Sequence, residues 1–192
     1  MSLLLRVCVL LWLGLHDALA PAAGTSLGQA LASAHQVLLM RHGYAPGVGD
    51  PPGYRLQDCS TQRNLDDAGR RQAESIGHWL RNQGVEQALV YSSPWCRCKD
   101  TAQGLGLGGY SVEPALGSFF DAPQDSGVQT RALAAFIADR LPAKGRRALI
   151  LVTHHVNIAA FVGENVGTGD MVLVQVNAQG RYLSHRRYPS PG

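Results

Sequence analysis

The stretch Leu38-Leu39-Met40-Arg41-His42-Gly43 joins a short apolar run to a cation, an imidazole and a glycine. Residues 37–40 are typical of a buried strand, and open α/β sheets bind ligands in the crevice beyond the carboxyl ends of their strands. Arg41 and His42 are therefore expected to face a ligand. A guanidinium offers a fixed fork of donors to phosphate oxygens, and a neutral imidazole nitrogen can attack phosphorus. Alone, such a triplet is common by chance, so the rest of the chain must support it.

The first residues are expected to be absent from the mature protein. Residues 7–15 are almost entirely apolar, Arg6 precedes them, and small residues around Ala20 and Ala22 follow. This run is too short for a membrane-spanning helix, which needs about 20 residues. We predict a secretory signal peptide over residues 1–22, cleaved after Ala22 or alternatively after Ala20, no stable membrane span after cleavage, and a periplasmic or secreted location. An uncleaved membrane anchor is the competing interpretation.

The remaining chain, residues 23–192, has the composition of one globular domain. The sequence of 192 residues is 45% hydrophobic and 16% charged, which allows one good core and excludes a disordered or collagen-like chain. Its net charge of +3 at pH 7 is small, and it contains no block of like charges. An extended nucleic-acid surface is therefore not expected.

The cysteines suggest a disulfide. Cys8 leaves with the signal peptide, so Cys59, Cys96 and Cys98 remain. In an oxidising compartment two of these are expected to pair. A bridge between Cys96 and Cys98 would close a strained loop, so we predict a disulfide from Cys59 to one of the two, and the sequence does not choose between them. The Cys-x-Cys pair lacks the spacing of structural zinc sites, and Arg97 between the thiols disfavours a cation, so no metal site is predicted.

Alternating strand and helix signals give the architecture. Asp66 is a suitable N-cap for an amphipathic helix over residues 67–83, and Gly84 stands where a C-terminal glycine belongs. Ser93 can cap the next helix, with Pro94 at its first position. Further strands are predicted at 88–91, 148–152, 171–176 and 182–184, a third helix at 130–141, and loops at 43–53 and 113–127. This order predicts an α/β fold, a three-layer α/β/α sandwich with a mostly parallel central sheet.

Three predicted strands end in residues suited to binding an anion. The strand at 37–40 leads to Arg41 and His42, the strand at 88–91 leads to Arg97, and the strand at 148–152 leads to His154. All three are expected to open on the same edge of the sheet. Two imidazoles and two guanidiniums around one anion suit phosphoryl transfer through a phosphohistidine, in which one imidazole attacks and the other groups neutralise charge.

These segments resemble those of the histidine phosphatase superfamily, in its phosphoglycerate mutase-like branch. The matching segments are Leu38-Leu39-Met40-Arg41-His42-Gly43, Arg63-Asn64-Leu65-Asp66-Asp67-Ala68-Gly69 with Gln72-Ala73, Ser92-Ser93-Pro94 through Arg97 to Thr101-Ala102, and Val152-Thr153-His154. Their order and spacing cover about residues 36–162. The resemblance implies that His42 is the nucleophile that becomes phosphorylated and that Arg41 and Arg97 bind the phosphate. It also implies that His154 stabilises the charge of the transferring group.

Arg63 and the general acid are less clearly assigned. Arg63 stands where the family often has a basic or polar residue, so it either reaches a phosphate oxygen or is an ordinary loop arginine. Many relatives carry a glutamate soon after a Pro-x-Leu-like segment, but here Gly117 and Ser118 follow Pro114-Ala115-Leu116. We expect Asp121 to protonate the leaving group instead, with Asp125 and then Glu113 as further candidates. Alternatively the enzyme has no dedicated acid, like compact relatives that cleave phosphoramidates.

The sequence therefore favours an exported phosphomonoesterase that needs no metal or other cofactor. Its expected substrate is a small or envelope-associated phosphorylated molecule, such as a glycolipid or a sugar phosphate, or a phosphoprotein. A mutase is disfavoured because the chain has few residues with which to build a closed, water-poor site. The alternative from another class is a phosphate-binding or envelope-interaction module with weak or no catalysis, and a thiol or metal protein ranks last.

Overall fold

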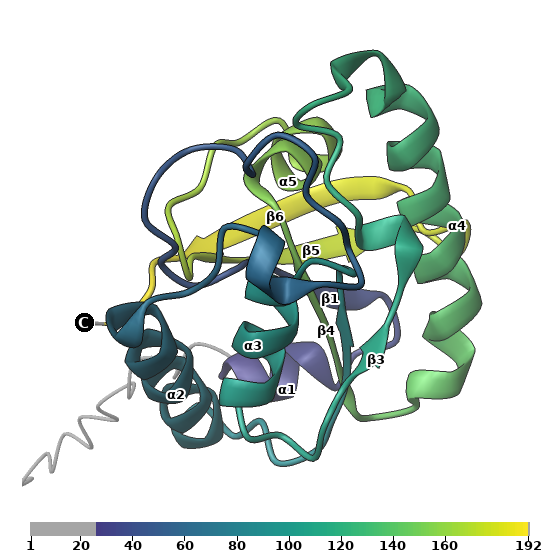
Figure 1. Ribbon diagram of the computed structural model, residues 1–192. Helices are drawn as coiled ribbons and strands as arrows, with labels where there is room; N and C mark the ends of the chain where they lie inside the picture. Colours follow the sequence, from purple (N-terminus) through teal and green to yellow (C-terminus); the bar gives the residue numbers. More distant parts are fainter. Residues whose placement is uncertain (1–25, 192) are drawn as a thin grey trace, which may run out of the picture.

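The structure is a computed structural model, and it describes residues 26–191. One sheet of six strands crosses the molecule in the order β3-β2-β4-β1-β5-β6 (Figure 1). Strands β1 to β4 run parallel, β5 is antiparallel to β1, and β6 is antiparallel to β5. The strands are β1 Gln36–Arg41, β2 Ala88–Ser92, β3 Ser111–Val112, β4 Ala148–Thr153, β5 Met171–Val176 and β6 Tyr182–Tyr188. The predicted α/β fold with a mostly parallel central sheet is confirmed.

Helices cover both faces of this sheet. They are α1 Leu27–Leu31, α2 Asp67–Asn82, α3 Cys96–Gly104, α4 Ser126–Lys144 and α5 His155–Val162. Side chains from α1, α2 and α3 share one core cluster with Leu38 and Met40, whereas side chains from α4 and α5 share another with Val37 and Leu39. Because successive side chains of a strand point to opposite faces, β1 contributes to both clusters. The sheet is thus the middle layer of a three-layer sandwich.

The apolar runs form the central strands because both of their faces are covered. Every residue of β4 is buried, as are the four central residues of β1. Burying a leucine or valine side chain stabilises a fold by about 1.5–3 kcal/mol, so these two neighbouring strands anchor the sheet. The residues that follow them are consequently held on a firm support.

Several predicted boundaries hold. The Asp66 side chain accepts a hydrogen bond from the amide of Gly69 at the start of α2, as an N-cap should. Gly84 follows α2 with a φ of 83°, which a glycine adopts without strain. Two other boundaries differ from the prediction. Helix α4 begins four residues before its predicted start at residue 130, and β6 extends four residues beyond its predicted end at residue 184.

The predicted start of α3 is wrong. The helix begins at Cys96 with Trp95 as its N-cap residue, so Pro94 lies before the helix instead of at its first position. Ser93 is not the cap because its hydroxyl lies 2.8 Å from Nε2 of His154. The same hydroxyl also accepts from the amide of Trp95 at 3.4 Å, so Ser93 bonds both across the site and to the residue before the helix.

A disulfide joins Cys59 to Cys96, with a Cα–Cα distance of 5.7 Å. This confirms a bridge from Cys59 and resolves its partner, while Cys98 is a free, buried thiol. The bridge ties the short 3-10 helix Cys59–Thr61 to the first residue of α3. Of the described residues, none belongs to a helix long and apolar enough to cross a membrane. The predicted signal peptide lies outside residues 26–191 and stays a prediction.

Candidate functional site

The structure brings together the three predicted strand ends, because β2, β4 and β1 are adjacent. The amide of His42 donates to the carbonyl of Thr153 at 3.0 Å, and the amide of Ser93 donates to the carbonyl of Val152 at 2.9 Å. These bonds continue the sheet one residue beyond each strand. A cavity of about 230 Å³ opens there, lined by Arg41, His42, Gly47, Val48, Gly49, Asp50, Arg63, Arg97, Ser118, Phe120, His154 and His155.

His42 is oriented by the backbone of the next residue. Its Nδ1 lies 2.7 Å from the carbonyl oxygen of Gly43. A carbonyl can only accept, so Nδ1 carries the proton and the lone pair of neutral His42 is on Nε2. The ring is 1% exposed, and burial lowers its pKa well below 6.5, with Arg97 and Arg41 acting in the same direction. Near neutral pH the imidazole is therefore uncharged, which is the state that the predicted nucleophile requires.

Gly43 is itself fixed in place by α3. Its amide donates to Oγ1 of Thr101 at 2.9 Å, and the same hydroxyl donates to the carbonyl of Arg97 at 2.6 Å. The loop that begins after His42 is thus tied to the helix that carries Arg97.

His154 faces His42 across the site, with the ring centroids 5.5 Å apart. Nη2 of Arg97 donates to its Nδ1 at 3.5 Å, so Nε2 carries the proton and donates to the hydroxyl of Ser93. Its pKa also lies well below 6.5, because the ring is buried and because His42 and Arg97 oppose a further positive charge. Beside it, burial raises the pKa of the Cys98 thiol to about 12, which keeps this cysteine protonated.

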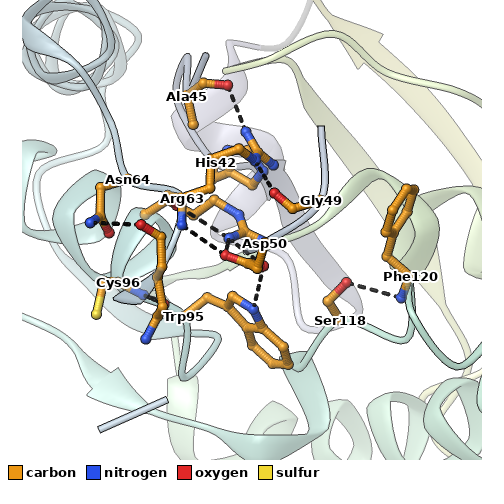
Figure 2. A network of polar contacts seen from close by, with 12 residues as sticks. His42, Ala45, Gly49, Asp50, Arg63, Asn64, Trp95, Cys96, Ser118 and Phe120 are labelled. Atoms are coloured by element: carbon orange, nitrogen blue, oxygen red, sulfur yellow. Dashed lines mark hydrogen bonds and ion pairs between the residues drawn. The ribbon is translucent and has the colours of Figure 1, made fainter. Parts of the chain in front are cut away.

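Asp50 organises the other side of the cavity, and sequence reasoning missed it. Its side chain is only 2% exposed, and both of its carboxylate oxygens accept from Nη1 of Arg97 at 2.9 and 3.0 Å. The indole of Trp95 and the amide of Arg63 donate to the same carboxylate at 3.1 and 2.9 Å. Figure 2 shows Asp50 between Arg63 and Trp95, with Ser118 and Phe120 on the neighbouring loop. The available signal was a carboxylate inside the glycine-rich loop that follows Arg41 and His42.

Arg63 is part of the cavity wall and also holds this loop. Its Nε donates to the carbonyl of Gly49 and its Nη1 to the carbonyl of Ala45, at 2.8 and 2.6 Å (Figure 2). Arg41 also lines the cavity and donates through Nη1 to the carbonyl of Val166 at 2.8 Å. Burial lowers the pKa of both side chains, although arginine remains charged at neutral pH.

Two arginine donors in the site are buried without an acceptor. The Nε atoms of Arg41 and Arg97 have no hydrogen-bond partner among residues 26–191. Buried donors are rarely left unpaired, and oxygens of a phosphate bound in the cavity would be suitable acceptors. The donor set therefore fits a phosphoryl group.

The predicted acid, Asp121, is exposed and is not among the residues that line the cavity. Asp125 is exposed as well, and the Glu113 side chain accepts from the amide of Ala115. Asp50 is consequently the one carboxylate in the described cavity wall, and its oxygens are already paired. The role of Asp121 stays a prediction.

The other histidines and Asn157 take supporting positions. His155 lines the cavity, with its ring 5.8 Å from that of Phe120. Asn157 donates to the carbonyl of Gly117 at 2.8 Å and so holds the loop before α4. His78 is exposed on α2 and accepts from Arg81, while His185 on β6 contacts Glu164. Neither of these last two approaches the cavity.

A second cavity, of about 760 Å³, lies away from the carboxyl ends of the strands. It is bordered by residues near both ends of α1, by the loop after α2 and by the end of α4, including Lys144. Nζ of Lys144 donates to the carbonyls of Leu31, Gly145 and Arg147, so this cation has a structural role. Within residues 26–191, no group of three or more histidine, cysteine or acidic side chains is placed to hold a metal ion.

A family model described as the histidine phosphatase superfamily (branch 1) matches residues 37–116. This range contains β1, α2, β2 and α3, and with them Arg41, His42, Asp50, Arg63 and Arg97. No curated protein matches the sequence significantly.

Solved structures share the fold. The protein histidine phosphatase SixA, solved with tungstate, has 22% sequence identity and a TM-score of 0.53, over 78% of this chain and 95% of that chain. A mycobacterial glucosyl-3-phosphoglycerate phosphatase has 17% identity and a TM-score of 0.56, over 80% and 96%. A phosphoserine phosphatase from Entamoeba histolytica, solved with 3-phosphoglyceric acid, has 12% identity and a TM-score of 0.55, over 77% and 93%.

Proposed function

We propose that this chain is an exported phosphatase that works through a phosphohistidine on His42. It has the histidine phosphatase fold, and its residues 37–116 match branch 1 of that superfamily. Nε2 of His42 attacks the phosphorus of the substrate, and the bond to the leaving group breaks as the N–P bond forms. Water then takes the phosphoryl group, which returns His42 to its neutral state and releases inorganic phosphate.

One observation carries this proposal: the bond from His42 Nδ1 to the carbonyl of Gly43. It directs the lone pair of Nε2 away from the backbone, in a cavity that also contains Arg41, Arg97 and His154. The guanidiniums supply fixed positive charge for the equatorial oxygens of the transferring group, as metal ions do in other phosphoryl-transfer enzymes. We therefore propose that the reaction needs no metal.

Export and the size of the substrate are parts of the same proposal. The Cys59–Cys96 disulfide supports an oxidising compartment, as does the predicted signal peptide. A cavity of about 230 Å³ accommodates a phosphoryl group and a compact part of a leaving group. A larger substrate, such as an envelope glycolipid or a phosphoprotein, would extend from its opening.

The source of the leaving-group proton separates two versions of the function. If Asp121 reaches the ester oxygen in the complex, alkyl phosphates are substrates. If no acid acts, turnover requires a leaving group that departs easily, such as an acidic phenol or a phosphoramidate nitrogen. Both carboxylate oxygens of Asp50 already accept hydrogen bonds, so this residue is not placed to act as the acid. This favours the version in which no acid acts.

Trapping the phosphoenzyme tests the proposal. The protein is mixed with excess 4-nitrophenyl phosphate and quenched within milliseconds in alkaline denaturant, in which phosphohistidine survives. Intact-mass spectrometry should detect one added phosphoryl group, which is lost after brief acid treatment. Peptide mapping should place this group on His42.

His42→Asn should abolish the adduct and lower kcat at least about 10³-fold, the scale of loss when a covalent nucleophile is removed. His78→Asn is the matched control, because His78 is exposed on α2 and lies outside the cavity wall. Turnover without any adduct would refute the mechanism. Phosphate binding without turnover of any ester or phosphoramidate would identify the protein as a binding module.

A further inference from the structure

The fixed charges of the cavity match those of one phosphate group. The wall contains the guanidiniums of Arg41, Arg63 and Arg97 and the carboxylate of Asp50. Burial lowers the pKa of each imidazole in the wall, so the three are neutral at pH 7: His42, His154 and His155. The sum is two positive charges. A phosphate monoester carries about −1.5 to −2 at this pH, so one phosphate neutralises the site.

Asp50 supplies the negative charge in this sum, and hydrogen bonds hold its side chain in the wall. The carboxylate is buried and accepts hydrogen bonds from Arg97, Trp95 and the backbone of Arg63. Arg97 still has Nε for a phosphate, and Nη2 has a second N–H besides the one that donates to His154, so Asp50 can hold Nη1 while substrate is bound. The pair is therefore compatible with the occupied site.

The rest of the wall offers no charge to a leaving group. Gly47, Val48, Gly49, Ser118 and Phe120 line it. Figure 2 shows Gly49 on one loop, with Ser118 and Phe120 on another. The two loops come close, since a Cβ built on Gly49 would lie 3.7 Å from Cε1 of Phe120. Phe120 is 41% exposed and Val48 86% exposed, so apolar surface is available at the opening. A leaving group would meet backbone and apolar atoms there.

Part of the donor capacity of the other two arginines is taken by backbone carbonyls, and a bound phosphate would take the donors that remain. Nε and Nη1 of Arg63 are bonded to the carbonyls of Gly49 and Ala45, and Nη1 of Arg41 is bonded to that of Val166. Once a phosphate occupies the site, its net charge is near zero. An anionic leaving group would lose hydration without electrostatic compensation. The only charged side chain of the loop at residues 43–53 is that of Asp50, which would repel it.

We propose that Asp50 is a specificity-determining residue, which restricts this site to phosphorylated substrates whose leaving group carries no negative charge. The inference rests on the phosphatase function proposed above and adds the class of leaving group. Asp50 acts in two ways: it holds Arg97 for the phosphate, and it opposes a second anion. The second action is the one that distinguishes it from a purely structural residue.

Two isosteric substrates test this: 4-carbamoylphenyl phosphate and 4-carboxyphenyl phosphate, which differ by one charge at the same position. The carboxylates of Asp50 and of the leaving group are treated as unit charges about 8 Å apart at an effective dielectric constant of about 20. Their repulsion is then strong enough to change binding more than tenfold. The wild type should therefore favour the carbamoyl ester in kcat/KM by at least about tenfold. Equal rates, or preference for the carboxylate, would overturn the inference.

Asp50→Asn should lower kcat/KM for both esters, because Arg97 loses its partner, and should reduce their ratio to about threefold or less. A structural role alone would lower both rates and leave the ratio unchanged, which would also overturn the proposal. Asp139→Asn on α4 is the matched control, since Asp139 is exposed and outside the cavity wall. If turnover by Asp50→Asn is too slow, the same ratio is measured from the dissociation constants of the two esters by calorimetry.

Failure of this inference is distinguishable from failure of the proposed function. A phosphoenzyme formed from 4-nitrophenyl phosphate, together with an unchanged ester ratio, would retain His42 as nucleophile and remove Asp50 from specificity. Absence of the phosphoenzyme, with a preference for the neutral ester in binding, would refute His42 as nucleophile and retain Asp50 as a specificity-determining residue.

Discussion

Removing the Cys59–Cys96 disulfide should both destabilise the protein and disturb the site. The bridge closes a loop with a sequence separation of 37 residues. In the chain-entropy description, a loop of this length lowers the entropy of the unfolded chain by about 13 cal/mol/K, which corresponds to about 3.8 kcal/mol at 25 °C. For a chain of this size, the melting temperature should fall by about 8–15 °C.

The same bridge connects two segments that supply the cavity wall. Cys96 directly precedes Arg97, and Cys59 lies four residues before Arg63. The amide of Cys96 also donates to Oε1 of Gln62 at 2.9 Å, and Nη1 of Arg97 donates to the carbonyl of Arg63 at 3.3 Å, so two hydrogen bonds still join the segments after reduction. We therefore expect Cys59→Ser/Cys96→Ser to remain folded at 25 °C but to have a lower kcat/KM.

Urea unfolding of the oxidised wild type and of the double variant measures the loss of stability. The reduced wild type is the matched control, because reduction breaks the bond without changing the sequence. The two single serine variants should each lose about as much as the double variant, since each already lacks the bridge. A loss below about 1 kcal/mol in the double variant, or a peptide map that links Cys59 to Cys98, would refute this reasoning.

Three further outcomes are expected. The rate of phosphoenzyme formation should stay level through pH 6.5 and fall only below it, because burial holds the pKa of His42 and of His154 well below 6.5. Below pH 6.5 these two histidines bind protons in the unfolded chain but not in the folded one. The urea midpoint should therefore decrease as the pH falls from about 7 to about 5, and an increase would contradict the lowered pKa of the two histidines. Asp121→Asn should slow alkyl phosphates about 100-fold and spare esters of acidic phenols, and equal rates in steady-state assays would exclude Asp121 as the acid. Gly69→Ala should lower the free energy of unfolding in urea by about 2 kcal/mol or more and reduce activity, because the new Cβ would lie 1.9 Å from the carbonyl oxygen of Tyr44 in the loop after His42. Gly127→Ala on the surface of α4 is the control, with an expected change below about 0.5 kcal/mol. A change that small for Gly69→Ala would disprove the clash.

The sequence predicts those parts of the fold that depend on local pattern. The apolar runs of β1 and β4 are buried on both faces, so each reads as a strand without knowledge of its neighbours. Asp66 caps α2 through the amide of Gly69, three residues along the chain. Arg41, His42, Arg97 and His154 were brought together in the prediction because the carboxyl ends of parallel strands meet at one edge.

Predictions from the sequence fail where a distant partner competes with a local one. Ser93 has the residue type and position of a helix cap, yet its hydroxyl contacts His154, which lies 61 residues further along the chain. Cys96 and Cys98 are equivalent by spacing, and only the fold of residues 54–64 brings Cys59 to Cys96. Pairing over such separations has no local signature, so the sequence left the disulfide partner open.

Asp50 shows why the charge of a site is harder to predict than its catalytic groups. Arg41, His42, Arg97 and His154 are identified because they follow the ends of regular strands. Asp50 instead comes from a loop whose path depends on Arg63. That path returns the carboxylate to Arg97, 47 residues away, and reduces the positive charge of the wall from three to two. A count of the three arginines without Asp50 would therefore favour substrates with an additional anionic group. The folded loop favours a single phosphate on a neutral leaving group, so the comparison of carbamoyl and carboxyl esters tests the fold of this loop as well as the chemistry of the site.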